Sequence, residues 1–311
     1  MTGLKNIPAD GPLIYAINHQ NALLDPLVIH SATWRNPYFL TRGDLFKNKL
    51  ANRFLRSIKM LPIYRIRDGY DSVKMNEGTF EETKEILLRG GVIGIFPEGS
   101  HNLQYRLRPL KKGVTRIAFL AEQAAGFNLN LKIVPIGIQY ESHFLSKGRT
   151  LVSIGEPIRV ADFKEGYQLD QNIGIDGLLD SIHSSIKKLM LHFENRQDYD
   201  ANLASFQKSR VYKRNLIEQL QSDQSLVSAI ESGKDFVDTA DSKFTIFTVP
   251  KIAWRFLWNL ISFFPRYCTD LMVKKTVQDP HFYGTMRYAY SGLLYPVFFL
   301  LIYFLVNFLV F

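Results

Sequence analysis

The chain has 311 residues and a formal net charge of +9 at pH 7. This length suffices for one domain with a substantial core and an appended segment. The positive charge indicates an anionic partner, either nucleic acid or an acidic membrane surface. The sequence has no zinc-ligand spacing, heptad-linked basic region or aromatic RNA-binding motif, which argues against nucleic acid. The single cysteine, Cys268, excludes an intramolecular disulfide, and the seven scattered histidines predict no metal site.

The first expected element is a buried strand over Leu13–Ile17, a short uncharged run after Gly11-Pro12. His19 lies in the polar loop that follows, and Asp25-Pro26 predicts a helix start with Asp25 as N-cap. Residues six apart on a helix point about 240° apart, so His19 and Asp25 can meet only if the loop folds back. Asp25 would then orient the imidazole, as a general base requires. The alternative is a coincidental spacing in which Asp25 only caps the helix.

A two-sided helical segment is expected between Arg42 and Met60, after a helix over Pro26–Thr33 and a strand over Pro37–Thr41. Its apolar positions fall near one face: Leu45, Leu50, Phe54, Leu55 and Ile58. Residues 41–67 contain eight Lys or Arg and one Asp. Such a run is commonly a solvated helix face. The imbalance of sign equally favours a surface facing phospholipid headgroups, at about 1 kcal/mol per basic residue.

Strands and helices alternate through the next hundred residues. We expect strands over Leu61–Ile66, Val92–Phe96, Lys132–Tyr140 and Arg149–Ile154, and helices over Asn76–Leu88 and Gly113–Ala125. This alternation predicts an α/β fold with a largely parallel central sheet flanked by helices. Ligands bind at the carboxyl ends of such strands. His19 and Glu98 both follow strands, so we expect them at one rim.

Residues 161–243 are polar. Their periodicity predicts helices over Leu178–Phe193 and Ala201–Leu220, and we expect these helices to pack against the core. Leu293–Phe311 is almost wholly apolar and, at about 20 residues, long enough to cross a hydrocarbon core. We favour membrane insertion for it over a buried core helix. Phe244–Phe264 is apolar with basic interruptions, which predicts an interfacial segment or the first half of a hairpin.

Three parts are therefore expected: a catalytic α/β core over residues 1–160, a helical extension over 161–243, and membrane-associated hydrophobic helices over 244–311. The first ten residues lack the apolar segment of a signal peptide. Between the two apolar segments lie three basic residues, Lys274, Lys275 and Arg287. They predict that this connection lies on the cytoplasmic side of the membrane. We expect the protein on the cytoplasmic face of the inner membrane, anchored by its C-terminal segments.

Four short blocks resemble those of the glycerolipid acyltransferase family, which includes the lysophosphatidate and glycerol-3-phosphate acyltransferases. In order, they are Asn18–Pro26, Leu61–Arg65, Ile93–Ser100 and Ile133–Gly137. The resemblance covers roughly residues 5–160 and is specific as a set. Two features depart from the family pattern. Five residues separate His19 from Asp25 where the family usually has four, and Ser100-His101-Asn102 replaces the usual basic residue after the third block.

The resemblance implies a membrane-bound O-acyltransferase of phospholipid biosynthesis. It would transfer a fatty acyl group from acyl-CoA or acyl carrier protein to a lysophospholipid, foremost 1-acylglycerol-3-phosphate, giving phosphatidate. The two departures leave glycerol-3-phosphate or an aminolipid open as acceptors. No bound cofactor is implied, and the partners are the donor, the acceptor and anionic membrane lipids. The alternative of another class is a non-catalytic module that binds anionic lipid.

The resemblance also assigns site residues. His19 is the expected general base and Asp25 the residue that orients it. The expected substrate-binding residues are Asn18, Arg65, Arg67, Glu98, Gly99, Ser100 and Lys112. Arg65 is the expected phosphate ligand, because a guanidinium matches phosphate oxygens, although a surface arginine is the alternative. For Glu98 the alternative is a carboxylate that structures only its own turn. Lys112 is expected to supply the positive charge that is missing after Ser100.

Overall fold

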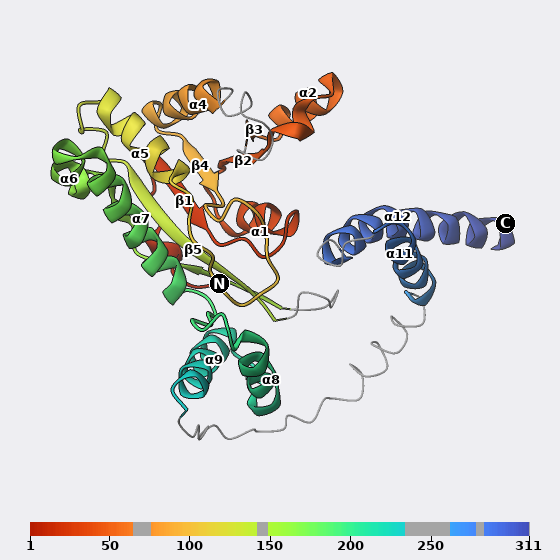
Figure 1. Cartoon of the computed structure of the whole chain (residues 1–311). Coiled ribbons are helices and arrows are strands. Elements are labelled where there is room, and N and C mark those ends of the chain that lie inside the picture. The colour runs from red at the N-terminus through yellow and green to blue at the C-terminus, as the bar shows by residue number, and fades with distance from the viewer. Residues whose placement is uncertain (65–75, 142–148, 234–261, 278–282, 311) are drawn as a thin grey trace.

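The computed structural model describes residues 1–64, 76–141, 149–233, 262–277 and 283–310. A seven-stranded sheet forms its centre, in the order β3-β2-β4-β1-β5-β6, with β7 also paired to β5 (Figure 1). The strands are β1 (Leu13–Ile17), β2 (Tyr38–Arg42), β3 (Met60–Ile63), β4 (Val92–Ile95), β5 (Lys132–Tyr140), β6 (Thr150–Ile154) and β7 (Ile158–Arg159). The first five run parallel to their neighbours, whereas β6 and β7 run antiparallel to β5. The predicted largely parallel sheet is confirmed.

The described residues also form helices. They are α1 (Leu24–Ala32), α2 (Lys49–Ser57), α4 (Asn76–Leu88), α5 (Gly113–Ala124), α6 (Lys164–Leu169), α7 (Gln171–Lys188), α8 (Tyr199–Ser209), α9 (Leu216–Glu231), α11 (Phe263–Thr276) and α12 (Tyr283–Val310), with 3-10 turns η1 (Leu4–Asn6), η2 (Gly43–Phe46) and η4 (Val160–Phe163). Side chains of β1 alternate between two cores. Ile14 packs in the core under α4, α5 and α7, and Tyr15 and Ile17 pack in the core that contains Ile29 of α1. All five β1 residues are buried.

Three expectations from the sequence need correction. Helix α1 begins at Leu24, so Asp25 lies in its first turn and is not the N-cap. The segment between Arg42 and Met60 consists of η2 and α2 rather than one helix. The helix expected over 201–220 is two helices, α8 and α9, because the chain turns to an extended conformation at Arg210.

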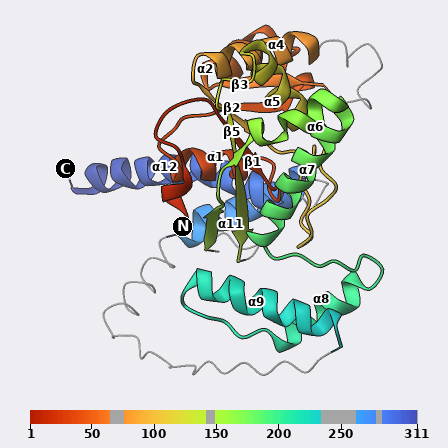
Figure 2. The same ribbon diagram turned by 90° about the vertical axis from the view of Figure 1, so that its left-hand side faces the viewer.

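The extension contacts the loop that leads away from Glu98. The backbone N–H of Leu107 donates to Nδ1 of His192 over 2.9 Å, and that of Tyr105 donates to the Tyr199 hydroxyl over 3.0 Å. Figure 2 shows α8 and α9 together at one end of the sheet. The division of the chain at residues 160 and 243 stays a prediction.

The C-terminal helices α11 and α12 pack against each other and lie apart from the sheet in Figure 1. Arg287 of α12 forms an ion pair with Asp270 of α11. Residues 286–304 of α12 are apolar, with a mean hydropathy of 1.2. No part of their most apolar stretch is buried. By length and composition this one helix, among the described residues, can cross a membrane. Residues 244–261, expected at the interface, lie outside the described residues.

Candidate active site

The topology brings three loops to one rim of the sheet. Strands β2, β4 and β1 are parallel neighbours, so their carboxyl ends lie at the same edge. His19 follows β1, Glu98 follows β4, and η2 follows β2. Ligands of open α/β sheets bind at such edges. The rim is therefore the place to examine the predicted catalytic residues.

His19 and Asp25 meet as predicted. Nδ1 of His19 lies 2.8 Å from Oδ2 of Asp25. The aspartate side chain is fully buried, whereas 13% of the histidine side chain is exposed. The loop folds back because Asn21 accepts hydrogen bonds from the backbone N–H groups of Leu23 and Leu24 and so caps the start of α1. Asn21, rather than Asp25, performs the capping that the sequence suggested.

Four donors surround the Asp25 carboxylate. Oδ2 accepts from His19 and from the backbone N–H groups of Gln20 and Asn21, both at 2.8 Å. Oδ1 accepts from the hydroxyl of Tyr140 at 2.6 Å. Burial, and then the neighbouring charge of Asp25, raises the pKa of Tyr140, which keeps its hydroxyl a donor. Because the carboxylate accepts on both oxygens, Nδ1 of His19 carries the hydrogen and Nε2 keeps a free lone pair.

The His19 ring stacks on the ring of Phe96, with centroids 4.2 Å apart and an interplanar angle of 22°. The ring of His101 meets it edge-on at 5.8 Å. The carbonyl of His19 accepts from the backbone N–H of Asn102 over 3.0 Å. Stacking and backbone bonding thus fix the ring plane as well as its hydrogen-bonded nitrogen. Such positioning is what proton transfer at a fixed point in space requires.

Glu98 joins the loops after β1 and β4. One carboxylate oxygen accepts from the backbone N–H of His19 over 2.7 Å. The other accepts from the backbone N–H and from Nε of Arg108, each at 3.2 Å. Burial raises the pKa of Glu98, and the donors from His19 and Arg108 oppose that rise. Glu98 therefore structures the rim itself, beyond its own turn.

The other predicted binding residues are placed as follows. The Asn18 side chain is buried and bonds both backbone groups of Ile138. Ser100 Oγ accepts from Nη1 of Arg108, and Gly99 supplies a left-handed turn with φ of 75°. Lys112 forms an ion pair with Asp176 of α7. Arg65 and Arg67 lie outside the described residues, and all seven substrate-binding assignments stay predictions.

Two site residues escaped the sequence interpretation. Tyr140 lies 115 positions from Asp25, at the end of β5, and only the pairing of β1 with β5 brings it close. Arg108 lies in an irregular stretch between Ser100 and Lys112 without any periodic pattern. It brings a guanidinium to the Glu98–Ser100 turn, where the family pattern would have a basic residue. A positive side chain thus lies near this turn although Ser100-His101-Asn102 follows the third block.

The comparisons with known proteins identify an acyltransferase domain. Residues 1–139 match the model of the family described as Acyltransferase. A 1-acyl-sn-glycerol-3-phosphate acyltransferase of Bacillus subtilis is 28% identical over 200 residues, which are 62% of this chain and 87% of that protein. Glycerol-3-phosphate O-acyltransferase 2 of Saccharomyces cerevisiae is 32% identical over 140 residues, 44% of this chain but 18% of the yeast protein. The chain thus spans most of the bacterial relative and less than a fifth of the yeast one.

Among solved structures, the 1-acyl-sn-glycerophosphate (LPA) acyltransferase PlsC from Thermotoga maritima aligns over 68% of this chain and 73% of its own, with 20% identity and a TM-score of 0.41. The family match contains both halves of the His19–Asp25 pair and the Glu98 turn. The chain contains a domain of the acyltransferase family. The matched domain and its named relatives identify the chain as an acyltransferase and argue against the non-catalytic lipid-binding module.

Proposed function

We propose that this acyltransferase moves a fatty acyl group from an acyl thioester, either acyl-CoA or acyl carrier protein, to the hydroxyl of a lysophospholipid. Lysophosphatidate is the first candidate acceptor, because relatives over this domain carry names of 1-acylglycerol-3-phosphate and glycerol-3-phosphate acyltransferases. Glycerol-3-phosphate and an aminolipid are the next candidates. The observation that carries the proposal is the 2.8 Å contact of His19 with a buried, fully bonded Asp25.

The proposed reaction begins with the acceptor hydroxyl at Nε2 of His19. This nitrogen takes the hydroxyl proton as the oxygen attacks the thioester carbonyl, and Asp25 stabilises the imidazolium that forms. The tetrahedral intermediate then expels the thiolate, which takes the proton back from His19. The products are an ester and a free thiol. No enzyme nucleophile is required, and Cys268 lies in α11, away from the rim.

The proposed location is the cytoplasmic face of a membrane, with α12 as the anchor. The exposed apolar surface of α12 supports this proposal, since an uncovered surface of this kind is costly in water. A lipid acceptor would then reach the rim from the bilayer. Arg65, which follows the edge strand β3, is the proposed phosphate ligand. A phosphate-free acceptor should be insensitive to Arg65→Ala, whereas lysophosphatidate should be turned over more slowly.

The decisive experiment supplies purified full-length protein with labelled donor and lysophosphatidate in mixed micelles. His19→Ala should lower kcat by roughly 10²–10⁴-fold, the usual contribution of a general base. His30→Ala is the matched control, because His30 is exposed on α1 and should leave kcat unchanged. Turnover by His19→Ala at the wild-type rate would refute the mechanism. Running the assay with acyl-CoA and with acyl carrier protein identifies the donor.

A further inference from the structure

Helix α2 is the parallel crossover between β2 and β3, yet it buries none of its residues. A crossover helix ordinarily packs an apolar stripe onto the sheet. Here the apolar stripe faces outward: Leu50 is 80% exposed and Phe54 63% exposed. Leu45 of η2 and Ile58 at the end of α2 are about half exposed. This is an apolar surface that the described parts of the chain leave uncovered.

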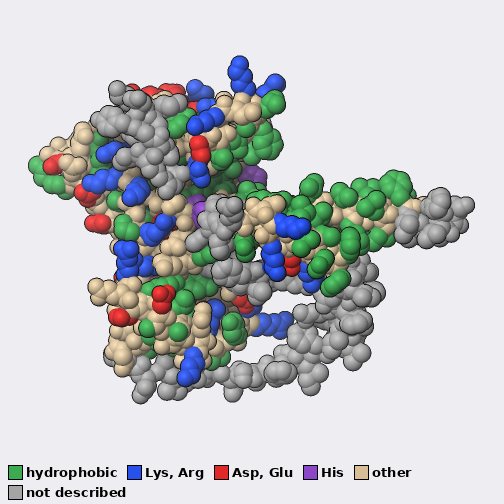
Figure 3. All heavy atoms as spheres, turned by 45° about the vertical axis from the view of Figure 1, so that its right-hand side comes forward, with side chains coloured by type: hydrophobic (Ala, Val, Ile, Leu, Met, Phe, Trp, Pro, Cys, Tyr) green, Lys and Arg blue, Asp and Glu red, His purple; other side chains and the backbone are tan. Residues whose placement is uncertain are grey.

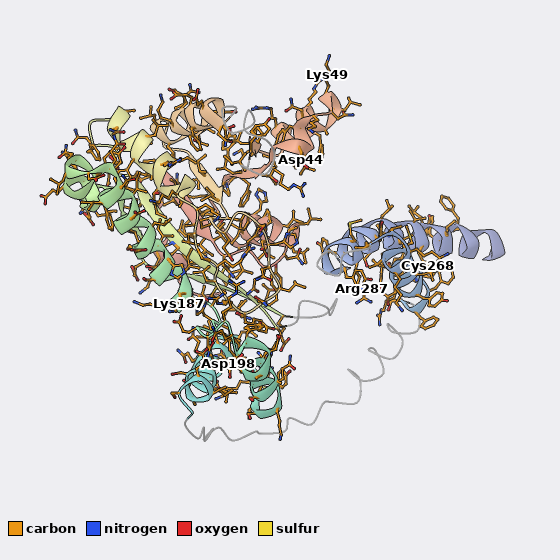
Figure 4. All side chains as sticks on the ribbon, in the orientation of Figure 1. Asp44, Lys49, Lys187, Asp198, Cys268 and Arg287 are labelled. Carbon is orange, nitrogen blue, oxygen red and sulfur yellow. The ribbon has the colours of Figure 1, made fainter. Side chains whose placement is uncertain are left out.

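A basic stripe runs beside the apolar one. Lys49, Arg53 and Arg56 recur at helical spacing. Lys49 directly precedes Leu50, and Arg53 directly precedes Phe54. Arg56 pairs with Glu82 of α4, whereas Lys49 and Arg53 have no carboxylate within ion-pair distance among the described residues. Figure 3 shows hydrophobic and basic side chains next to each other at this end of the molecule. Figure 4 shows Lys49 at the outer edge of the molecule, beside α2.

The α2 segment is attached to the rim of the active site. It leaves the carboxyl end of β2, which lies beside β4 and thus beside the Glu98 turn. At the point where the chain leaves β2, position 43 requires glycine, because a Cβ there would lie 2.3 Å from the Tyr64 ring. Large apolar side chains are also exposed after the His19 loop: Leu23 directly before α1, and Leu27 within it. Exposed apolar groups therefore lie on two chain segments that lead away from the rim.

We infer that the outer face of α2, defined by Leu45, Lys49, Leu50, Arg53 and Phe54, lies in the headgroup region of an anionic bilayer. An apolar stripe flanked by lysine and arginine matches the interface between acyl chains and negative headgroups. This contact is separate from the anchor α12 and faces the active-site rim toward the membrane. It rests on the proposed function only for the lipid nature of the acceptor.

The test uses the full-length chain in nanodiscs, with Cys268→Ser to remove the native thiol. A single cysteine replaces Phe54 and carries an environment-sensitive fluorophore. In discs of phosphatidylcholine with phosphatidylglycerol, the emission should shift to the blue and be quenched by brominated acyl chains. The matched control is Leu169→Cys, which is 82% exposed at the end of α6, at the opposite side of the sheet in Figure 1. Its emission should stay that of a label in water.

Equal, water-like emission at positions 54 and 169 would overturn the inference. A blue shift without quenching by bromolipid, rising with protein concentration, would also overturn it, because a second copy would then cover α2. Lys49→Gln and Arg53→Gln, which each remove one positive charge, should each weaken insertion about fivefold in the anionic discs only, from about 1 kcal/mol per basic residue. The same weakening without anionic lipid would contradict the charge argument.

An activity measurement separates this inference from the proposed function. Leu50→Ser with Phe54→Ser should slow the acylation of a long-chain acceptor in vesicles several-fold. The same variant should acylate a short-chain, water-soluble acceptor at the wild-type rate. Slow turnover of both acceptors by the variant would contradict a role in membrane docking. If wild-type protein acylates neither acceptor, the proposed function fails, and the fluorescence result still decides the position of α2.

Discussion

The His19 loop and the α2 segment leave neighbouring parts of the same rim, and they treat their side chains in opposite ways. The loop buries polar groups and bonds them: Asp25 has four donors, and Glu98 holds the backbone of His19. The α2 segment exposes apolar groups and leaves Lys49 and Arg53 outside any ion pair among the described residues. One part is complete within the protein, and the other requires a surface outside it.

This difference corresponds to the two tasks that we propose for the rim. Proton transfer needs atoms held at fixed positions, and buried hydrogen bonds provide that rigidity. Contact with a fluid bilayer needs apolar area and positive charge but no fixed partner. Substitutions in the loop should therefore change kcat, whereas substitutions on α2 should change access to lipid acceptors only. The predictions below test the first half of this division, from the largest expected effect to the smallest.

Asp25→Asn should have the largest effect, roughly a 10³-fold loss of kcat. An amide presents an N–H to His19 or loses the donors on its oxygens, so the imidazole no longer keeps its free lone pair at Nε2. Single-turnover kinetics with saturating acceptor measures the loss. Asp162→Asn, at an exposed position in η4, is the control. A loss below tenfold would mean that His19 works without Asp25.

His192 tests how the loop after Glu98 is held. Burial is the main cause that lowers the pKa of His192 to about 4, with positive neighbours adding to it, and its Nδ1 accepts from Leu107. The unfolded chain binds a proton near pH 6.5. Stability is therefore complete above about pH 6.5 and falls as pH drops toward 4, by roughly 3 kcal/mol for this group.

Amide hydrogen exchange at Leu107 measures this effect locally. Exchange, corrected for its intrinsic pH dependence, should become faster from pH 6.5 to 4.5 in the wild type. His192→Asn keeps an acceptor for Leu107 but cannot be protonated, so its exchange should change less over that interval. An identical pH response of the two proteins would show that another group controls this loop.

Arg108→Ala should lower kcat by about 30-fold at neutral pH, as expected for a lost charge-assisted contact of about 2 kcal/mol. Without the guanidinium, the pKa of the buried Glu98 rises further, and the protonated form no longer accepts from both His19 and the Arg108 backbone. The acid limb of the pH–rate profile should move to higher pH. Arg108→Lys should restore part of kcat and part of the original position of the acid limb. Arg116→Ala, on the exposed side of α5, should change neither kcat nor the acid limb. An unmoved acid limb would contradict the role of this pair.

Tyr140→Phe should have the smallest effect, a loss of kcat of about tenfold with an unchanged KM for the donor. It removes one of the four donors to Asp25 and leaves the other three in place. Asp25 would still orient His19, but with more freedom. A loss as large as that of Asp25→Asn would show that Tyr140 takes part in proton transfer rather than in positioning.

The sequence predicted the parts of this site that local patterns control. The bounds of β1, α4 and β5 agree with the expected ones, because a short apolar run and a helical period are local features. The His19–Asp25 pair was predicted from a motif. Tyr140 could not be predicted, because its role depends on the pairing of β1 with β5. Arg108 could not be predicted either, because it lies in an irregular stretch without a periodic pattern. The apolar stripe of α2 was visible in the sequence, but periodicity identifies a face without telling what covers it.

Asn18 has a consequence for how this domain tolerates change. Its side chain donates to the carbonyl of Ile138 and accepts from the N–H of the same residue, as another peptide group would. The carboxamide thus extends the hydrogen bonding between β1 and β5 by one residue, directly before His19, the proposed general base. Aspartate lacks the donor, leucine lacks both groups, and glutamine is one methylene too long. The two bonds to Ile138 therefore favour asparagine over these three residues at position 18.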